Sequence, residues 1–279
     1  MSRINNSWQL VKASWSVLLA DKELVIFPII SFFASMIVVA TFFLPMLFAG
    51  VFDAIFAGGM QVVGFVVGFA FYIFLYFVTF FFNSALVGAA MIRLEGGDPT
   101  VGDGLRIAFQ HISSIFGYAV IAATVGMILR AISERAGFLG RIVVGLIGFA
   151  WNVATFLVVP TLVVEGVGPV DGVKRSAALL KKTWGEQLVG NFSIGLIFGL
   201  VIFGVILVSG ALIVMAAIAN LIWLVVALVL LDVMVLIVLG LISSSLNGIF
   251  TAAVYQYATT GESKYFDPDM VKNTFKQKR

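Results

Sequence analysis

The sequence predicts an all-α, polytopic membrane protein with six transmembrane helices in three helical hairpins, each hairpin preceded by an amphipathic interfacial helix. Of the 279 residues, 61% are hydrophobic and only 11% are charged. The mean hydropathy is +1.12, and a soluble chain of this length could not bury the apolar surface that this value implies. The apolar runs are continuous and long, whereas the strands of a membrane β-barrel alternate over about ten residues. A stretch whose apolar residues fall on one side of a helix precedes each pair of apolar runs.

The six apolar runs are each long enough to cross a hydrocarbon core of about 30 Å. They lie at roughly 24–49, 60–92, 114–133, 142–164, 187–218 and 221–257. Polar or turn-rich segments separate them. We therefore expect a single transmembrane domain over residues 1–260, followed by a basic cytoplasmic tail at 261–279.

Three stretches beside these runs show apolar residues at spacings of 4, 3 and 4, which places each set on one helical stripe. The stripes are Ile4, Trp8, Val11 and Trp15; Leu105, Phe109, Ile112 and Phe116; and Val173, Ala177, Leu180 and Trp184. In the third stretch the basic residues Lys174, Arg175, Lys181 and Lys182 share the other side. A helix of this kind suits the surface of an anionic leaflet, and a loop helix packed on its own protein is the alternative.

These stretches predict contacts with lipid headgroups. The predicted contact residues are Lys174, Arg175, Lys181, Lys182 and Trp184 in the third stretch, and Trp8 and Trp15 in the first. Tryptophan is typical of the headgroup level of a bilayer. The expected partners are therefore the bilayer and its anionic lipids, and not nucleic acid.

The distribution of positive charge predicts the orientation. Of the 17 Lys and Arg residues, all but Arg130, Arg135 and Arg141 fall on the side of the two termini. The positive-inside rule then places both termini in the cytoplasm and the protein in the inner membrane.

A threefold internal repeat is suggested, with units at about 3–93, 99–165 and 169–257. A shift of 68 residues aligns Asp103-Gly104 with Asp171-Gly172, and Phe116-Gly117 with Trp184-Gly185. All units point the same way, unlike the inverted repeats of many transporters. The alternative is that amphipathic helices and hairpins resemble one another in any membrane protein.

Asn83, Asn152 and Asn247 occur late in the second helix of the three predicted units. They would converge if the units surround a pseudo-threefold axis. They would then form either interhelical hydrogen bonds, worth about 0.6 kcal/mol each, or a polar constriction in a conducting path.

Asp232 is the only acid well inside an apolar run, about 16 Å of helix beyond the turn near Asn220. An ionised carboxylate at that depth costs about 2.5–3.5 kcal/mol. We therefore expect Asp232 to be protonated, paired or facing water. Arg130 is the predicted partner.

Two segments resemble a known family. SWQLVKASWSVLLADKELVIFPIIS (Ser7 to Ser31) resembles the opening of a family of bacterial and archaeal membrane proteins of unknown function. PTLVVEGVGPVDGVKRSAALLKKTWG (Pro160 to Gly185) resembles a segment of that family, and is similar to the membrane domain of some bacterial glycerophosphodiester phosphodiesterases. The resemblance implies a membrane fold. It implies no phosphodiesterase activity, because the soluble domain of those enzymes is absent from this sequence.

Enzyme chemistry finds little support. The chain has no cysteine and one histidine, His111, and it has no H-E-x-x-H, P-loop or G-x-S-x-G motif. We predict no cofactor, no metal site and no catalytic residue. Two G-x-x-x-G pairs, Gly64–Gly68 and Gly195–Gly199, allow close helix contact within the chain, which we favour, or with a second copy or a membrane-protein partner.

The function predicted from the sequence stays open between two classes. The first is a passive channel or transporter for a small solute or lipid. The second is a structural protein that grips lipid or assembles with partners.

Overall fold

The computed structural model describes residues 3–48, 61–184 and 193–261, and all of them lie in helices or in short connections between helices. The helices are α1 (Arg3–Ala20), η1 (Lys22–Val25), α2 (Ile26–Phe48), α4 (Gln61–Glu95), α5 (Val101–Gln110), α6 (Ile112–Arg135), α7 (Phe138–Ala154), α8 (Val158–Val164), α9 (Pro169–Trp184), α10 (Ser193–Ile218) and α11 (Ile222–Thr260). In these ranges six helical segments are long and apolar enough to cross a membrane, which confirms the predicted class. The predicted tail beyond Gly261 lies outside the described residues.

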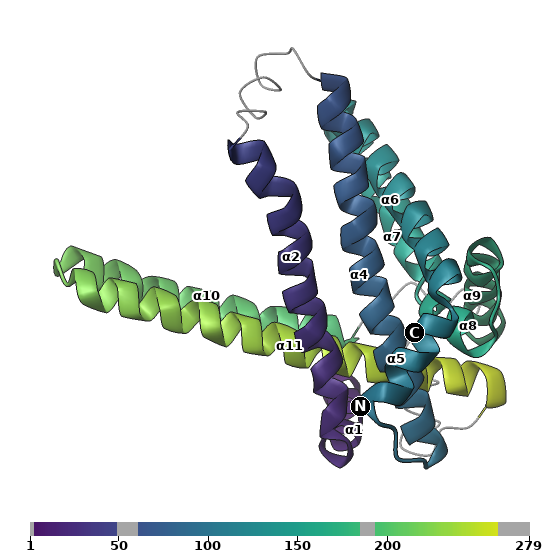
Figure 1. Cartoon of the computed structure of the whole chain (residues 1–279). Coiled ribbons are helices and arrows are strands. Elements are labelled where there is room, and N and C mark those ends of the chain that lie inside the picture. Colours follow the sequence, from purple (N-terminus) through teal and green to yellow (C-terminus); the bar gives the residue numbers. More distant parts are fainter. Residues whose placement is uncertain (1–2, 49–60, 185–192, 262–279) are drawn as a thin grey trace.

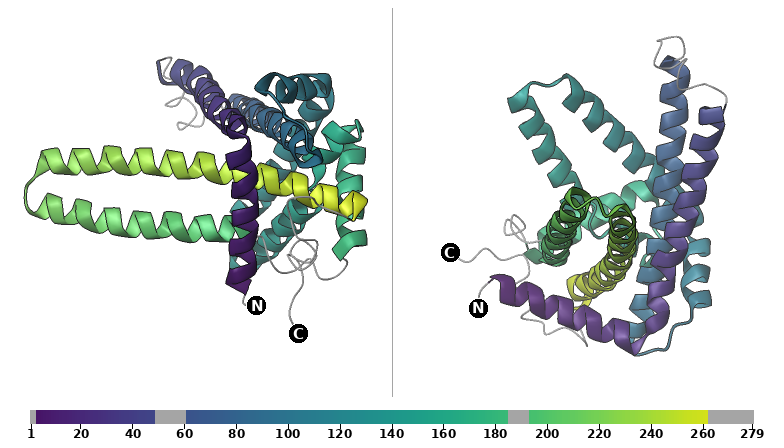
Figure 2. Two further views of the ribbon diagram at one scale, coloured as in Figure 1. Left: turned by 90° about the horizontal axis from the view of Figure 1, so that it is seen from below. Right: turned by 90° about the vertical axis from the view of Figure 1, so that its left-hand side faces the viewer.

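Three hairpins diverge from a common base (Figure 1; Figure 2). The first arm pairs α2 with α4, the second pairs α6 with α7, and the third pairs α10 with α11. The base consists of α1, η1, α5, α8 and α9 together with the C-terminal halves of α4 and α11. A surface helix precedes each arm in the chain: α1, α5 and α9 in turn. The third arm points away from the other two (Figure 1).

The buried core lies in the base, where α4 and α11 cross. Each helix contributes a pair of fully buried alanines, Ala89 and Ala90 from α4 and Ala252 and Ala253 from α11. Small side chains let helix backbones approach closely, as is usual between membrane helices. Gly104 of α5 shows the same closeness, because a Cβ built there would lie 2.6 Å from the carbonyl oxygen of Ala85.

The arms expose large apolar side chains along much of their length. Phe48 and Trp223 are 84% and 85% exposed, and both lie near the outer ends of their arms. In a bilayer such helices satisfy their own backbone hydrogen bonds and present their apolar side chains to lipid tails. The fold thus divides into a packed base and arms suited to lipid.

The expected packing of the G-x-x-x-G pairs within the chain is wrong at Gly68 and Gly199. A Cβ built at either position meets no other atom of the described chain within 4 Å. Both glycines lie in arms, where the neighbouring surface is open. The sequence motif is present, but the helix against which it was expected to pack does not lie there.

Local sequence explains where the helices of the base begin and end. Thr100 and Asp103 form a capping box at the start of α5, in which the Thr100 hydroxyl accepts from the Asp103 amide and the Asp103 carboxylate accepts from the Thr100 amide. These hydrogen bonds from Thr100 lower the pKa of Asp103 below its ordinary value. α11 ends at Gly261, whose φ of +78° is the left-handed conformation that glycine adopts readily.

The predicted apolar stripes differ from the buried faces. In α1 the buried face carries Leu10, Ser14 and Val17, while Trp8 and Trp15 are exposed. In α9 the buried residues are Gly172, Ser176, Leu179 and Leu180. Except for Leu180, each of them precedes a residue of the predicted stripe by one position. The stripe from Leu105 to Phe116 is not one helix, because α5 ends at Gln110 and α6 begins at Ile112.

Candidate functional site

Two adjoining cavities lie where the arms join the base. Their volumes are about 250 Å³ and about 460 Å³. Asn83 of α4 and Thr251 of α11 line both, so the cavities share a wall, and we call the pair the twin cavity.

The smaller cavity lies between α2, α4 and α11 and is rich in short polar side chains. Its remaining lining is Pro28, Ser31, Thr79, Phe82, Leu86, Ser244, Asn247 and Gly248. Hydroxyls and amides therefore face it from all three helices. Such groups form hydrogen bonds with water or with an uncharged polar ligand.

The larger cavity lies mainly between α4, α6 and α7 and has an aromatic wall. Its remaining lining is Tyr76, Phe80, Tyr118, Ala122, Gly126, Leu129, Gly148, Trp151, Asn152, Thr155, Phe156 and Val159. The Tyr76 and Phe80 rings are stacked with centroids 5.7 Å apart, and the Phe80 and Tyr118 centroids are 4.6 Å apart. This cavity combines an apolar, aromatic body with a few polar groups, as ligand pockets generally do.

The structure brings the three asparagines together around the twin cavity. Asn83 and Asn247 line the smaller cavity, and Asn83 and Asn152 line the larger. They come from three different arms, since α4 belongs to the first, α7 to the second and α11 to the third. The lining of the twin cavity thus includes residues of every arm.

The threonine hydroxyls in the lining donate to carbonyl oxygens four residues earlier in the chain. The hydroxyl of Thr251 donates to the carbonyl oxygen of Asn247 at 2.8 Å, and that of Thr155 donates to the carbonyl oxygen of Trp151 at 2.8 Å. Their lone pairs remain as acceptors. Among the described residues the Asn83 and Asn152 side chains have no hydrogen-bond partner, so their amide N–H groups are available to a ligand.

Neither cavity is lined by a charged side chain within the described ranges. A charged solute would find no counter-ion there, and its desolvation would be uncompensated. The lining therefore favours a neutral ligand with hydrogen-bonding groups.

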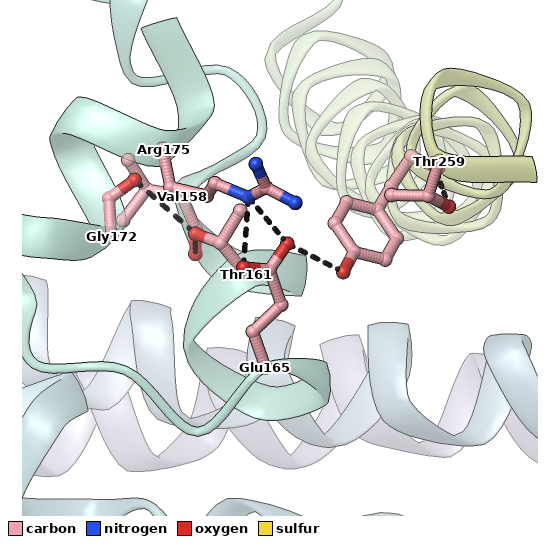
Figure 3. A network of polar contacts seen from close by, with 7 residues as sticks. Val158, Thr161, Glu165, Gly172, Arg175 and Thr259 are labelled. Carbon is pink, nitrogen blue, oxygen red and sulfur yellow. Dashed lines mark hydrogen bonds and ion pairs between the residues drawn. The ribbon is translucent and has the colours of Figure 1, made fainter. Parts of the chain in front are cut away.

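A polar network holds three helices of the base together close to the site (Figure 3). Glu165, just after α8, accepts from Nε of Arg175 in α9 at 2.9 and 3.0 Å. The hydroxyl of Tyr255 in α11 donates to the same carboxylate at 3.0 Å. Glu165 is the centre of the network, because both partners depend on it.

The break between α7 and α8 is also fixed from α9. The helix stops at Ala154 and resumes at Val158, so one predicted apolar run contains two helices. The backbone amide of Leu157, which lies in the break, donates to the buried hydroxyl of Ser176 at 3.0 Å. That bond satisfies a donor that the broken helix leaves free, and it stabilises the turn beside Thr155 of the larger cavity.

Arg130 and Asp232 do not form the predicted pair. Arg130 is engaged elsewhere, with Nε 2.8 Å from Glu134 of its own helix and a guanidinium nitrogen 3.0 Å from the Tyr72 hydroxyl of α4 in the first arm. Asp232 lies on the third arm, facing a 510 Å³ pocket between α10 and α11 that also contains Ser209. One carboxylate oxygen of Asp232 is buried without a hydrogen-bond partner in the described chain. The prediction failed because the third arm carries Asp232 away from α6.

The predicted headgroup residues lie mostly on open surface. Lys174, Lys181 and Lys182 are exposed on α9, and Lys174 lies 3.4 Å from Asp171. Arg175 is half exposed and is engaged by Glu165. The Trp184 side chain lies outside the described residues.

Sequence reasoning missed Thr251, Thr155, Tyr76 and Tyr118 as lining residues. A signal existed for the threonines, because Thr251 follows Asn247 by four residues and Thr155 follows Asn152 by three. Those spacings place each pair on one helix face. No such signal links Glu165 to Tyr255, which are 90 residues apart.

The described residues contain no group of three or more His, Cys, Asp or Glu side chains that could hold a metal ion.

Comparison with curated proteins found no match, and comparison with solved structures also found none. A family comparison matches residues 62–265, which covers the second to sixth spans and all three asparagines. The match extends over well over half of the sequence, and the chain belongs to the family of unknown function DUF6159.

Proposed function

We propose that this protein is a non-enzymatic, multi-pass protein of the cytoplasmic membrane that passively moves a small uncharged solute, or the polar part of a lipid, through the twin cavity. The observation that carries the proposal is the meeting of Asn83, Asn152 and Asn247, from three arms, around one uncharged polar space. Polar side chains in transmembrane segments are costly unless they face a partner, a ligand or water. A polar lining at the crossing of the spans is the arrangement that selective membrane pathways use.

The divergence of the arms supports access from the lipid side. The arms diverge from the base (Figure 2), and the larger cavity is lined from both the first and the second arm, so an amphipathic molecule that enters between these arms would present its polar part to the cavity. The aromatic wall of the larger cavity suits the less polar part of such a molecule. A glycerol-sized solute satisfies the same hydrogen-bonding groups, so the substrate class is neutral and hydroxylated.

The proposal includes a location in the inner membrane and an orientation with both termini in the cytoplasm. The excess of Lys and Arg on the terminal side supports cytoplasmic termini and an inner-membrane location. The resemblance to bacterial and archaeal membrane proteins, and to the membrane domain attached to some phosphodiesterases, supports a membrane role. Tags placed at residue 2 and after Arg279 should be shielded in intact cells and accessible in inverted vesicles. A tag accessible from outside at either end would reject this topology.

Flux into proteoliposomes tests the transport proposal. Protein-containing vesicles should take up a small neutral polyol such as glycerol, or exchange a labelled neutral lipid between leaflets, faster than empty vesicles. Asn83→Leu should reduce that rate about tenfold or more, because Asn83 lines both halves of the twin cavity. Thr124→Val is the matched control, since Thr124 bonds within α6 to Val120 and is not among the lining residues. Equal rates in the two variants, or no flux above empty vesicles, would count against transport.

The second candidate is a structural or assembly protein, and the third arm favours it. Gly199, Gly204 and Gly210 of α10 leave open surface in the described structure, so another helix can pack closely there. The partner would be a second copy or another membrane protein. A defined oligomer held by α10, together with vesicles that show no flux, would select this function over transport.

A further inference from the structure

Helix α1 is apolar on two faces. One face is buried in the base through Leu10, Ser14 and Val17. The other exposes Trp8 and Trp15, at 48% and 40%. A helix on a water-facing surface normally carries polar residues opposite its buried stripe, so the aromatic face of α1 indicates an apolar environment.

A groove runs between this aromatic face and the third arm. α1 crosses the root of the α10–α11 hairpin, as the left panel of Figure 2 shows. The groove has a volume of about 420 Å³ and is lined by Trp8, Val11, Lys12, Trp15, Ser16 and Leu19 of α1, Phe198 and Val201 of α10, and Leu246 of α11. None of these residues lines the twin cavity, so the groove is a separate place on the molecule.

The polar groups of the groove side chains are concentrated on α1. The Ser16 hydroxyl is already bonded to the carbonyl oxygen of Ala13 at 2.7 Å, which leaves the Lys12 ammonium as the strongest free group. Its Nζ lies 5.9 Å from the centroid of the Trp8 ring. No carboxylate of the described chain forms an ion pair with Lys12. The groove therefore offers one positive charge beside two indoles and a long apolar floor.

We infer that this groove binds one anionic phospholipid, with its phosphate at Lys12 and an acyl chain against Val201, Phe198 and Leu246. A phospholipid is the occupant whose negative head and apolar chain match both ends of the groove at once. The two indoles suit the headgroup level, where an apolar ring and an N–H donor are both satisfied. A free anion would gain nothing from the apolar floor. The lipid would fill the space between α1 and the third arm and hold the two together.

Native mass spectrometry of the full-length protein in detergent tests this site, with phosphatidylglycerol and phosphatidylcholine as the probes. The wild-type protein should retain one phosphatidylglycerol in a step that is separate from weaker, non-specific additions. Lys12→Gln should weaken that first step about fivefold, because one basic residue near an anionic group contributes about that factor. Its affinity for phosphatidylcholine should change less than about twofold.

Lys22→Gln is the matched control, because Lys22 is exposed on η1 and does not line the groove. It removes the same charge and should leave the first phosphatidylglycerol step unchanged. Equal weakening by Lys12→Gln and Lys22→Gln would overturn the site and indicate general attraction to anionic lipid. Absence of a discrete one-lipid step in the wild-type protein would overturn it too.

A second variant tests the apolar half of the groove. Val201 is 45% exposed, so Val201→Trp can fill the space without disturbing the buried core. It should abolish the first binding step for both lipids. If the Val201→Trp variant still binds one lipid, the proposed position of the acyl chain is wrong. Disulfide-linked dimers of a Val201→Cys variant would show that a second copy occupies the groove, which also contradicts the proposal.

Discussion

In the base, Gly104 lies so close to α4 that an added methyl group would meet a backbone carbonyl, whereas in the third arm Gly204 faces nothing within 4 Å. The two glycines are in helices of the same protein, yet they contribute in different ways. The first lets two helices pack in contact, and the second leaves a surface for lipid or a partner. The contrast shows that the base is packed closely by the chain itself, whereas the third arm keeps open surface along α10.

The largest expected difference comes from adding a methyl group in each region. Gly104→Ala should lower the free energy of unfolding by about 2–3 kcal/mol, because Ala85 O and the Phe27 ring cannot both move away. Gly204→Ala should be neutral or stabilise by up to about 1 kcal/mol, as expected for alanine in an open helix. Denaturant unfolding in detergent micelles measures both. Equal effects would mean that the base is no more tightly packed than the arm.

The Glu165 network tests whether partly buried polar contacts stabilise the base more than an exposed ion pair does. Glu165→Ala should cost about 2 kcal/mol, since Arg175 and Tyr255 both lose a charged acceptor and the Glu165 side chain is only 22% exposed. Asp171→Ala breaks the exposed pair with Lys174 and should cost less than about 0.5 kcal/mol. Thermal unfolding of the two variants checks this order. If Asp171→Ala proves the more harmful change, the network does not hold the base.

The capping box of α5 predicts a smaller effect that depends on pH. Thr100→Ala should cost about 1 kcal/mol near neutral pH, through loss of the N-cap hydrogen bond. The pKa of Asp103 in the folded protein lies below its ordinary value of 3.8, chiefly because of the Thr100 hydrogen bonds. Ionised Asp103 therefore stabilises the fold above that ordinary value, and this stability is lost as the pH falls through the lowered pKa.

Unfolding followed from roughly pH 5 to pH 2 should then show a shallower acid loss in Thr100→Ala than in the wild type. Ser133→Ala, close to the end of α6 and away from the base, is the control and should follow the wild-type profile. Parallel profiles for wild type and Thr100→Ala would show that the capping box does not control Asp103.

Asp232→Asn should have the smallest effect, less than about 0.5 kcal/mol. Its side chain has no ion-pair partner among the described residues, and one of its carboxylate oxygens is already without a hydrogen bond. Unfolding of the variant in detergent gives the value. A loss well above 1 kcal/mol would indicate that the third arm holds Asp232 through a specific contact, and the arm would then resemble the base.

The spans could be predicted from sequence because length and hydropathy decide them. The run placed at roughly 114–133 is α6 (Ile112–Arg135), and the run placed at roughly 221–257 is α11 (Ile222–Thr260). The Arg130 to Glu134 pair was also readable, since the two residues lie four apart on one helix. A distant partner was preferred for Arg130, and that preference was wrong.

Features held by distant residues could not be predicted. The break after Ala154 is stabilised by Ser176 of α9. No sequence pattern links that serine to the break. The close approach at Gly104 depends on how α5 meets α4, while the G-x-x-x-G pattern at Gly195–Gly199 suggested packing where none is found at Gly199. Local patterns describe each helix, but the direction of the arms follows from contacts across the whole base.

α11 is one unbroken helix of 39 residues, about 58 Å long, which runs from the tip of the third arm through the base. Gly248 divides α11 into a long and a short side, and a Cβ added there would clash with the Leu86 side chain, so α11 and α4 are in close contact at this point. The long side, from Ile222 to Gly248, measures about 39 Å, and the short side, from Gly248 to Thr260, about 18 Å. Thr251 and Tyr255 lie on that short side, where α11 is packed in the base. The same unbroken helix therefore forms part of the third arm and supplies Thr251 to the wall of the twin cavity.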